Sequence, residues 1–292
     1  MVIRHGIHDG RVRAACIVLA WCLLYARLVP ELVFDWTDSG DFSHGFLIPI
    51  VAVVLIWMRR SWLARAVSAP DARGALLLLA GLAIQLAGSA ASELYLQRFS
   101  MIPFLLGWIL LLEGKERMRI LLFPVLFLLF MIPPPNIFWS SISLPLQLLA
   151  SRVAGAALQL AHIPVVRDGN VLHLETCSLE VASACSGIRS LVALLSLAAV
   201  IAEGSLIGST GPRSILSKML LVAAAIPVAV AVNALRVTSA AFVATSAGKD
   251  AADRFHDISG FVMFAVAFAI LAGWKEVLRW IEERSLSRQA LS

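Results

Sequence analysis

This sequence has few charged side chains and an excess of apolar ones. Asp, Glu, Lys and Arg together make up 15% of its 292 residues, whereas hydrophobic residues make up 60%. A soluble domain of this length could not cover so much apolar surface. The apolar residues also gather in successive runs of the size that crosses about 30 Å of hydrocarbon. The sequence therefore predicts a polytopic membrane protein and excludes a water-soluble globular enzyme.

Cysteine is also scarce, because the chain has only four. Four cysteines are too few for a disulfide framework. Cys16 and Cys22 lie inside the first apolar run, where we interpret them as core packing. Cys177 and Cys185 remain, and a disulfide between them in an oxidising compartment is one alternative for this pair.

Sequence signals for nucleic acid, metal and cofactor binding are missing. The formal net charge of +5 comes without a basic patch interleaved with aromatic residues, so no nucleic-acid partner is predicted. His44, His162, His173 and Cys177 do not form a helical His pair with Glu or a Cys-x-x-Cys. We predict no metal site and no cofactor.

Eight apolar runs are predicted to cross the membrane. The first follows Arg4, Arg11 and Arg13 and has no small-x-small cleavage site, which indicates a retained signal anchor. Several runs are shorter than the about 20 residues that a helix needs to cross the hydrocarbon. Flanking residues must then extend the helix, or the bilayer must be thinner there. The predicted spans are residues 14–34, 46–58, 74–92, 99–112, 120–132, 188–202, 219–237 and 258–274. A re-entrant hairpin of the fourth and fifth runs is disfavoured because its tip, residues 113–119, would bury five charged groups.

The segment between the fifth and sixth spans has a different pattern. Three consecutive prolines from Pro133 end the fifth span. Residues 137–162 have an amphipathic helical pattern, which predicts either a helix on the membrane surface or a packed cap helix of the bundle. Apolar and polar residues alternate over 165–181, and residues 167–170 have the composition of a turn. This pattern predicts a short β-hairpin. The predicted fold is thus an all-α membrane protein of about eight spans with this extracytoplasmic helix and hairpin.

The distribution of basic residues predicts the orientation. Eight spans place both termini on one side, and sixteen of the 24 Lys and Arg residues fall in segments on that side. The positive-inside rule then makes both termini cytoplasmic. Three ionisable residues from three different spans, Cys185, Arg236 and His256, consequently fall at the outer surface. An acidic loop at 35–41 and a polar turn at 245–255 are predicted on the same outer side.

Cys185 is the predicted nucleophile. It lies at the start of a predicted helix, where unpaired N–H groups and the positive end of the helix dipole favour the thiolate that attacks. Gly187 has no Cβ and lets a substrate backbone approach. Ser186 is a weaker candidate because the Gly-x-Ser-x-Gly pattern is missing.

His256 and Arg236 supply the other parts needed for acyl transfer. His256 begins the last span, where the helix dipole keeps the imidazole neutral and able to take a proton. Arg236 is a permanent cation near the hydrocarbon, and such a group indicates a functional site. Its alternative roles are snorkelling to headgroups or an ion pair with Asp253 or Asp257. In the catalytic reading Cys185 forms a thioester, His256 moves the proton and Arg236 stabilises the thiolate or the oxyanion.

Three ordered motifs resemble the exosortase/archaeosortase family of membrane-embedded transpeptidases. They are residues 184–190 (ACSGIRS), 233–237 (NALRV) and 256–261 (HDISGF), with weaker agreement at 43–46 (SHGF) and at the prolines. The resemblance extends from the second span to the eighth. It implies Cys185, Arg236 and His256 as the catalytic residues.

The resemblance also implies a substrate and a location. Substrates would be exported proteins whose C-terminal signal combines a short motif, a transmembrane helix and a basic tail. The enzyme would cleave them and pass them to a cell-surface acceptor, often alongside exopolysaccharide production. It would lie among the lipids of the bacterial inner membrane with its site facing the periplasm. We predict one domain, 1–292, without the additional C-terminal soluble domain of some members; an accessory protein could then act separately.

Two other classes of function compete with the enzyme. A transporter or channel would use the same ionisable groups as a pathway, but Gln85 is nearly alone as a mid-span polar residue. A non-catalytic component of an export or exopolysaccharide system would need none of the three residues individually. Asn233 and His44 are candidate supporting residues, and neither is predicted to be essential.

Overall fold

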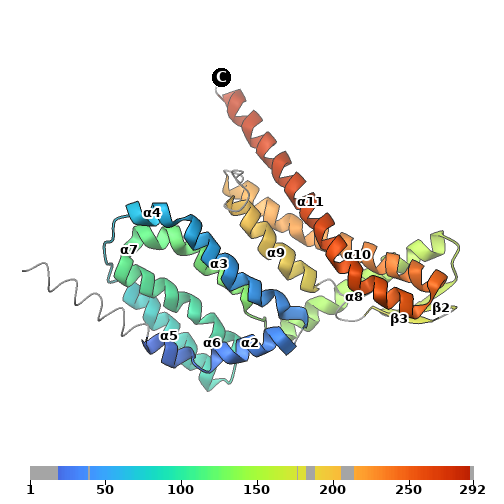
Figure 1. Cartoon of the computed structure of the whole chain (residues 1–292), viewed down its shortest axis with the longest axis horizontal. Coiled ribbons are helices and arrows are strands. Elements are labelled where there is room, and N and C mark those ends of the chain that lie inside the picture. Colours follow the sequence, from blue (N-terminus) through green and yellow to red (C-terminus); the bar gives the residue numbers. More distant parts are fainter. Residues whose placement is uncertain (1–18, 39, 176, 182–187, 205–213, 290–292) are drawn as a thin grey trace, which may run out of the picture. The chain divides into compact units, whose positions relative to one another are not determined.

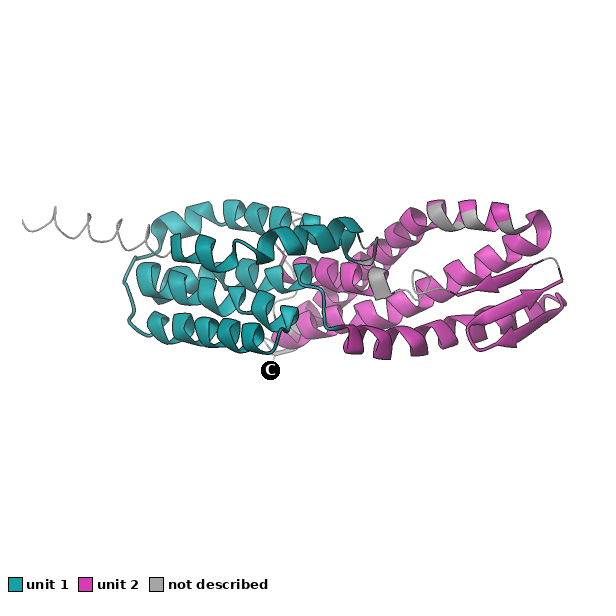
Figure 2. Cartoon of the chain, turned by 90° about the horizontal axis from the view of Figure 1, so that it is seen from below, with its two compact units in different colours: residues 1–135 teal, residues 136–292 magenta. Residues whose placement is uncertain are grey.

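The protein is described here by a computed structural model. It describes residues 19–38, 40–175, 177–181, 188–204 and 214–289. The chain forms two compact units, Met1–Pro135 and Asn136–Ser292, which Figure 2 shows in different colours.

The described part of unit 1 consists of helices and their connecting segments (Figure 1). Apolar runs produce the longer helices, and polar segments between them form short helical turns. In chain order the elements are α2 (Leu28–Asp38), η1 (Gly40–Phe46), α3 (Leu47–Met58), α4 (Arg60–Arg65), α5 (Gly74–Ala90), α6 (Leu94–Phe99), α7 (Met101–Phe127) and η2 (Leu128–Met131).

Helix α7 reverses direction at Gly114. That residue has φ 84° and ψ −179°, a conformation outside the helical region that glycine adopts without strain. Ile102 and Val125 belong to one buried cluster, although a straight helix would separate them by about 34 Å. The chain therefore doubles back, in agreement with two separate predicted runs at 99–112 and 120–132. Whether each half crosses the bilayer stays a prediction, because the apolar segment Leu94–Met131 forms one candidate span.

Helix α5 packs closely against α6 and the first half of α7 through glycines that recur every seventh residue. A Cβ on Gly74 would lie 2.3 Å from the backbone N of Leu111, and one on Gly81 would lie 2.9 Å from that of Phe104. Gly88 has the same relation to Gln97, at 2.9 Å. The contacts run in opposite directions along the two segments, so α5 is antiparallel to its neighbour.

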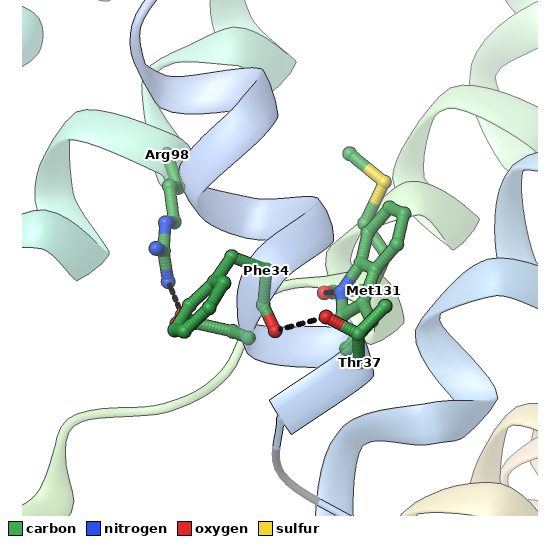
Figure 3. Close-up of polar contacts among 6 residues, drawn as sticks. Phe34, Thr37, Arg98 and Met131 are labelled. Atoms are coloured by element: carbon green, nitrogen blue, oxygen red, sulfur yellow. Dashed lines mark hydrogen bonds and ion pairs between the residues drawn. The ribbon is translucent and has the colours of Figure 1, made fainter.

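Helix α2 extends further than the sequence predicted, and the expected acidic loop at 35–41 is wrong. Residues 35–38 are helical, and η1 follows. Asp35 forms an ion pair with Arg98 of α6 at 2.6 Å, and the Trp36 Nε1–H donates to the carbonyl of Met131 at 2.9 Å (Figure 3). Because these polar side chains form hydrogen bonds within the bundle, residues 35–38 can be helical and do not have to form a solvent-exposed loop.

Cys22 is exposed, so its interpretation as core packing is wrong. It belongs to the helical residues 19–25 that precede α2. In a membrane protein a lipid-facing position is as apolar as the core, so a cysteine side chain is stable in either place. Cys16 lies outside the described residues.

In its described part, unit 2 combines four helices with a small sheet. Its elements are α8 (Asn136–Leu160), β1 (Val165–Asp168), β2 (Val171–Leu174), β3 (Ser178–Glu180), α9 (Ile188–Glu203), α10 (Ile215–Ala247) and α11 (Lys249–Gln289). Helices α9, α10 and α11 run alongside one another, and the C-terminal end of α11 extends past the other two (Figure 1). Their shared core includes Leu194 of α9, Ala225 of α10 and Leu271 of α11.

Helix α8 packs against α10 and the sheet, as in the second of the two predicted arrangements, a packed cap helix. Both polar and apolar side chains of α8 are buried, the apolar ones including Ala150, Ala154 and Leu158. Ser143, Gln147 and Ser151 are buried at four-residue spacing, whereas Ile137 and Phe138 are among the exposed apolar residues. An exposed apolar face suits lipid rather than water, and α8 is long and apolar enough to cross a membrane.

The predicted hairpin at 165–181 contains a further strand. The sheet has three antiparallel strands in the order β1-β2-β3, so the segment forms two successive hairpins. Leu172, at the centre of β2, is 0% exposed and packs in the same cluster as Ala154 of α8 and Val237 of α10. The sheet therefore lies over α8 and the C-terminal half of α10.

The polar turn predicted at 245–255 is wrong. Helix α10 continues to Ala247 and α11 begins at Lys249, so Gly248 alone separates them, with φ 81°. A single left-handed glycine suffices to end one helix and start another. Both helices are therefore longer than the predicted spans 219–237 and 258–274.

Four helical segments of the described chain are long and apolar enough to cross a membrane. They are Leu94–Met131, Asn136–Leu160, Ile215–Ala247 and Ile258–Ser285. Shorter apolar helices cover Phe42–Met58, Gly74–Ala90 and Ser190–Glu203. The chain is thus a helical membrane protein, and the eight crossings stay a prediction.

Candidate functional site

A cleft opens where α9, α10 and α11 meet within unit 2. Each helix contributes residues at three- and four-residue spacing, the spacing that places side chains on one helical face. The lining residues are Ser190 and Leu194 from α9, Ala229, Val232, Asn233 and Arg236 from α10, and Gly260, Met263 and Phe264 from α11. Residues from all three sequence motifs therefore meet in one place.

Arg236 is held across the surface of α11. Its Nε–H donates to the Ser259 hydroxyl at 3.4 Å, and Ser259 is 4% exposed. A Cβ built on Gly260 would lie 3.3 Å from Nη2 of Arg236 and 3.6 Å from Cζ. The absence of a side chain at residue 260 thus leaves room for the guanidinium.

Asn233 stands one helical turn before Arg236 and lines the same cleft. Its side chain is 5% exposed, which indicates a position inside the helix interface rather than on the lipid-facing surface. The cleft consequently contains a cation, an amide and the Ser190 hydroxyl beside apolar side chains. These few polar groups lie in an otherwise apolar wall.

Cys185 lies outside the described residues, and so does the side chain of His256. The backbone at 256 belongs to α11, one helical turn before Gly260. Residue 190, which lines the cleft, follows Cys185 by five positions, so extended backbone separates them by at most about 18 Å. The meeting of Cys185, Arg236 and His256 stays a prediction, and so does a disulfide of Cys185. Cys177 is free.

The chain is anchored just before Cys185. Val181, 1% exposed, donates its N–H to the carbonyl of Asn170 at 2.9 Å. Its own carbonyl accepts from the Asn170 side-chain amide at 3.1 Å. The same turn is bonded to α8, because the Ser151 hydroxyl donates to the carbonyl of Gly169 at 3.0 Å. Sequence reasoning missed this anchor, although it placed the turn at 167–170.

The other residues singled out in the sequence lie elsewhere. His44 belongs to η1 of unit 1, and His162 follows α8 with φ 59°. His173 contacts the Ser178 hydroxyl through Nδ1 at 2.8 Å, on the exposed face of the sheet. Within the described residues there is no group of three His, Cys, Asp or Glu side chains that could hold a metal ion.

Unit 1 has a buried polar cluster of its own. Ser100 is 0% exposed, and its hydroxyl lies 2.9 Å from the Tyr25 hydroxyl and 3.0 Å from Oε1 of Gln85. Gln85 is therefore bonded within the bundle. The hydrogen bond to Ser100 explains how a polar Gln85 can lie in the middle of an apolar helix, and no transport pathway is needed to explain it.

The fold and the cleft define a class: a polytopic helical membrane protein with a polar site between three of its helices. Within that class, the family model described as transmembrane exosortase matches residues 36–273. The chain therefore belongs to the transmembrane exosortase family. The match spans both compact units, and a single domain over 1–292 stays a prediction. Neither the curated proteins nor the solved structures gave a match.

Proposed function

We propose that this exosortase-family protein is a cysteine protease and transpeptidase that cleaves the C-terminal sorting signals of exported proteins. Cys185 is the nucleophile, His256 the general base and acid, and Arg236 the stabilising cation. The observation that carries the proposal is the cleft: residues adjoining or belonging to all three motifs, Ser190, Arg236 and Gly260, line it together.

The reaction proceeds through a thioester. The Cys185 thiolate attacks the carbonyl carbon of a substrate peptide bond, a C–S bond forms and the C–N bond breaks. His256 takes the thiol proton and gives it to the leaving amine. An amine, a hydroxyl or water then attacks the thioester, and the neutral His256 takes its proton. The C–S bond breaks, the acyl group passes to the nucleophile, and the Cys185 thiolate is restored with protonated His256 beside it.

Arg236 is suited to stabilise negative charge in this reaction. It lies half-buried between helices, where water screens its charge less than at the surface. A fixed cation beside an oxyanion lowers the barrier by a few kcal/mol, corresponding to about 10²–10³ in rate. The guanidinium keeps its charge at any physiological pH.

The substrates we propose are proteins with a short motif, a transmembrane helix and a basic tail. A membrane enzyme with an outer site meets that motif where it leaves the bilayer. We place the enzyme in the bacterial inner membrane with both termini cytoplasmic and the site facing the periplasm. A separate accessory protein and an exopolysaccharide system are proposed partners.

The test is processing of a co-expressed exported protein with such a C-terminal signal. We expect Cys185→Ala and Cys185→Ser to abolish the shortened product, His256→Ala to reduce it at least about a hundredfold and Arg236→Ala by about 10²–10³. Mass spectrometry of the product's new C-terminus would identify the cut and the acceptor.

Cys22→Ala is the matched control, because it changes the same residue type at an exposed position in the other unit. It should process substrate as the unchanged protein does. Normal processing by Cys185→Ala would refute the enzyme and leave a non-catalytic role in the membrane.

A further inference from the structure

Strand β3 is the edge of the sheet that leads into the Cys185 segment. Among the described strands, in the order β1-β2-β3, it has one neighbour, β2, and it ends at Glu180, five residues before Cys185. Ser178 and Glu180 are exposed, whereas Leu179 between them is half-buried. The strand therefore presents one edge and one face outward.

The register determines which backbone groups point to that outer edge. Val181 donates to Asn170 and Leu174 donates to Cys177, at 2.9 and 2.8 Å. Hydrogen-bonded pairs alternate along an antiparallel ladder, so Leu172↔Leu179 is the pair between them. The N–H and C=O groups of Ser178 and Glu180 then point away from β2, and no hydrogen bond of the described residues engages them.

We propose that this outer edge binds the substrate polypeptide as an added strand; the inference rests on the proposed function. Ser178 and Glu180 offer two N–H and two C=O groups with the spacing of an extended chain. A cysteine that attacks a peptide carbonyl needs its substrate held extended nearby. The three-residue edge suits a short motif and is too short to template aggregation.

The position of the edge limits where the substrate is cut. Glu180 and Cys185 are five residues apart, which extended backbone spans in at most about 18 Å. A substrate strand rises about 3.3 Å per residue. The scissile bond therefore lies within about five residues of the segment paired with β3. Main-chain pairing would hold substrates of varied sequence, while side chains near the cut would select among them.

The experiment uses the purified full-length protein in detergent. The probe is a synthetic peptide covering the cleaved region of the co-expressed substrate, with single backbone N-methyl groups placed at successive residues. Methylation should lower kcat/KM about tenfold at two residues that are two positions apart and leave the residue between them unaffected, because only alternate N–H groups face β3.

A variant of the protein tests the same contact from the other side. Glu180→Pro removes the outward N–H, and its comparison with Glu180→Ala separates the N–H from the side chain. KM should be about fivefold to tenfold higher for the proline variant than for the alanine variant. Val165→Pro is the matched control, since the register gives β1 the same outward N–H at the opposite edge of the sheet.

The proposal is overturned if methylation has no effect at any residue, or if it lowers kcat/KM at consecutive residues alike. Equal KM values for Glu180→Pro and Glu180→Ala would overturn it too. A change in oligomeric state without a change in KM would assign the edge to a second copy of the chain, which also overturns it. Failure of the unmethylated peptide to be cleaved, or cleavage by Cys185→Ala, would instead contradict the proposed function.

Discussion

At the scale of single residues, the guanidinium of Arg236 depends on a glycine. Nη2 and Cζ of Arg236 lie 3.3 and 3.6 Å from the position that a Cβ at residue 260 would take, and Ser259 accepts a hydrogen bond from Nε. The protein thus uses a missing side chain on one helix to place a charged one from another. We treat Ser259 and Gly260 as positioning residues for Arg236.

Side chains added at residue 260 should lower activity without unfolding the protein. In Gly260→Ala the Arg236 guanidinium has to shift by a few tenths of an ångström, and kcat/KM should fall about tenfold. In Gly260→Leu it has to shift further, and kcat/KM should fall at least about a hundredfold. Alanine also favours helix by about 1 kcal/mol, so stability and activity should change in opposite directions. Peptide cleavage and thermal unfolding in detergent measure the two.

Gly273→Ala is the control for this series, because it makes the same change on the same helix. A Cβ at residue 273 meets no atom within 4 Å. Its activity should be unchanged and its stability slightly higher. Equal loss of activity in Gly260→Ala and Gly273→Ala would show that helix stiffness, and not the position of Arg236, is responsible.

The polar cluster of unit 1 makes a second prediction at this scale. Ser100→Ala leaves the buried Tyr25 hydroxyl and Gln85 amide without this partner, which should destabilise the protein by about 1–3 kcal/mol. Tyr25→Phe combined with Ser100→Ala should cost less than the sum of the single changes, because the orphaned hydroxyl is removed too. A double-mutant cycle of unfolding free energies measures this. Strict additivity would show that the hydroxyls do not interact.

At the scale of elements, close packing requires glycine on both helices of the α5–α7 pair. A Cβ on Gly107 would lie 2.5 Å from the backbone N of Leu78, and one on Gly74 would lie 2.6 Å from the carbonyl O of Gly107. Backbone atoms cannot move aside as flexible side chains do. The separation of the two helices is therefore set by these residues.

Gly107→Ala should separate α5 from α7 and lower stability. The clash should outweigh the gain in helix propensity, with a net loss of about 1–2 kcal/mol. The midpoint of thermal unfolding in detergent should fall, whereas Gly273→Ala should not lower it. An unchanged midpoint for Gly107→Ala would show that the helices pack less closely than described.

At the scale of the whole molecule, orientation follows from charge. The Lys and Arg residues gather at the termini and at alternate connections, which predicts a cytoplasmic tip for the α7 reversal and an outer position for the sheet. Lys115 is exposed at that tip and Asp168 is exposed on β1. These two residues report the sidedness of the two units separately.

Cysteine labelling tests this topology. In a background without native cysteines, Asp168→Cys should react with a membrane-impermeant maleimide in intact spheroplasts, and Lys115→Cys should react only after permeabilisation. Labelling of Lys115→Cys from outside would overturn the predicted topology of unit 1. Both variants should label fully in detergent, which controls for burial.

The sequence by itself determined the class of protein, the family motifs and the approximate position of most helices. These features depend on the hydropathy and spacing of residues that are close together in the sequence, so they can be predicted without knowing how the chain folds. Tertiary structure decided what depends on distant partners. Asp35 forms an ion pair with Arg98, 63 residues further along the chain, and Gln147 and Ser151 of α8 form hydrogen bonds with the turn between β1 and β2.

The same distinction applies to the candidate site. Arg236 could be identified from its position at the end of an apolar run, because a permanent charge there is costly wherever the helix packs. Ser190, Ser259 and Gly260 lie within the sequence motifs, but their roles could not be predicted, since these depend on which faces of α9, α10 and α11 meet. Only the packed helices decide that a small residue on one of them makes room for a guanidinium on another.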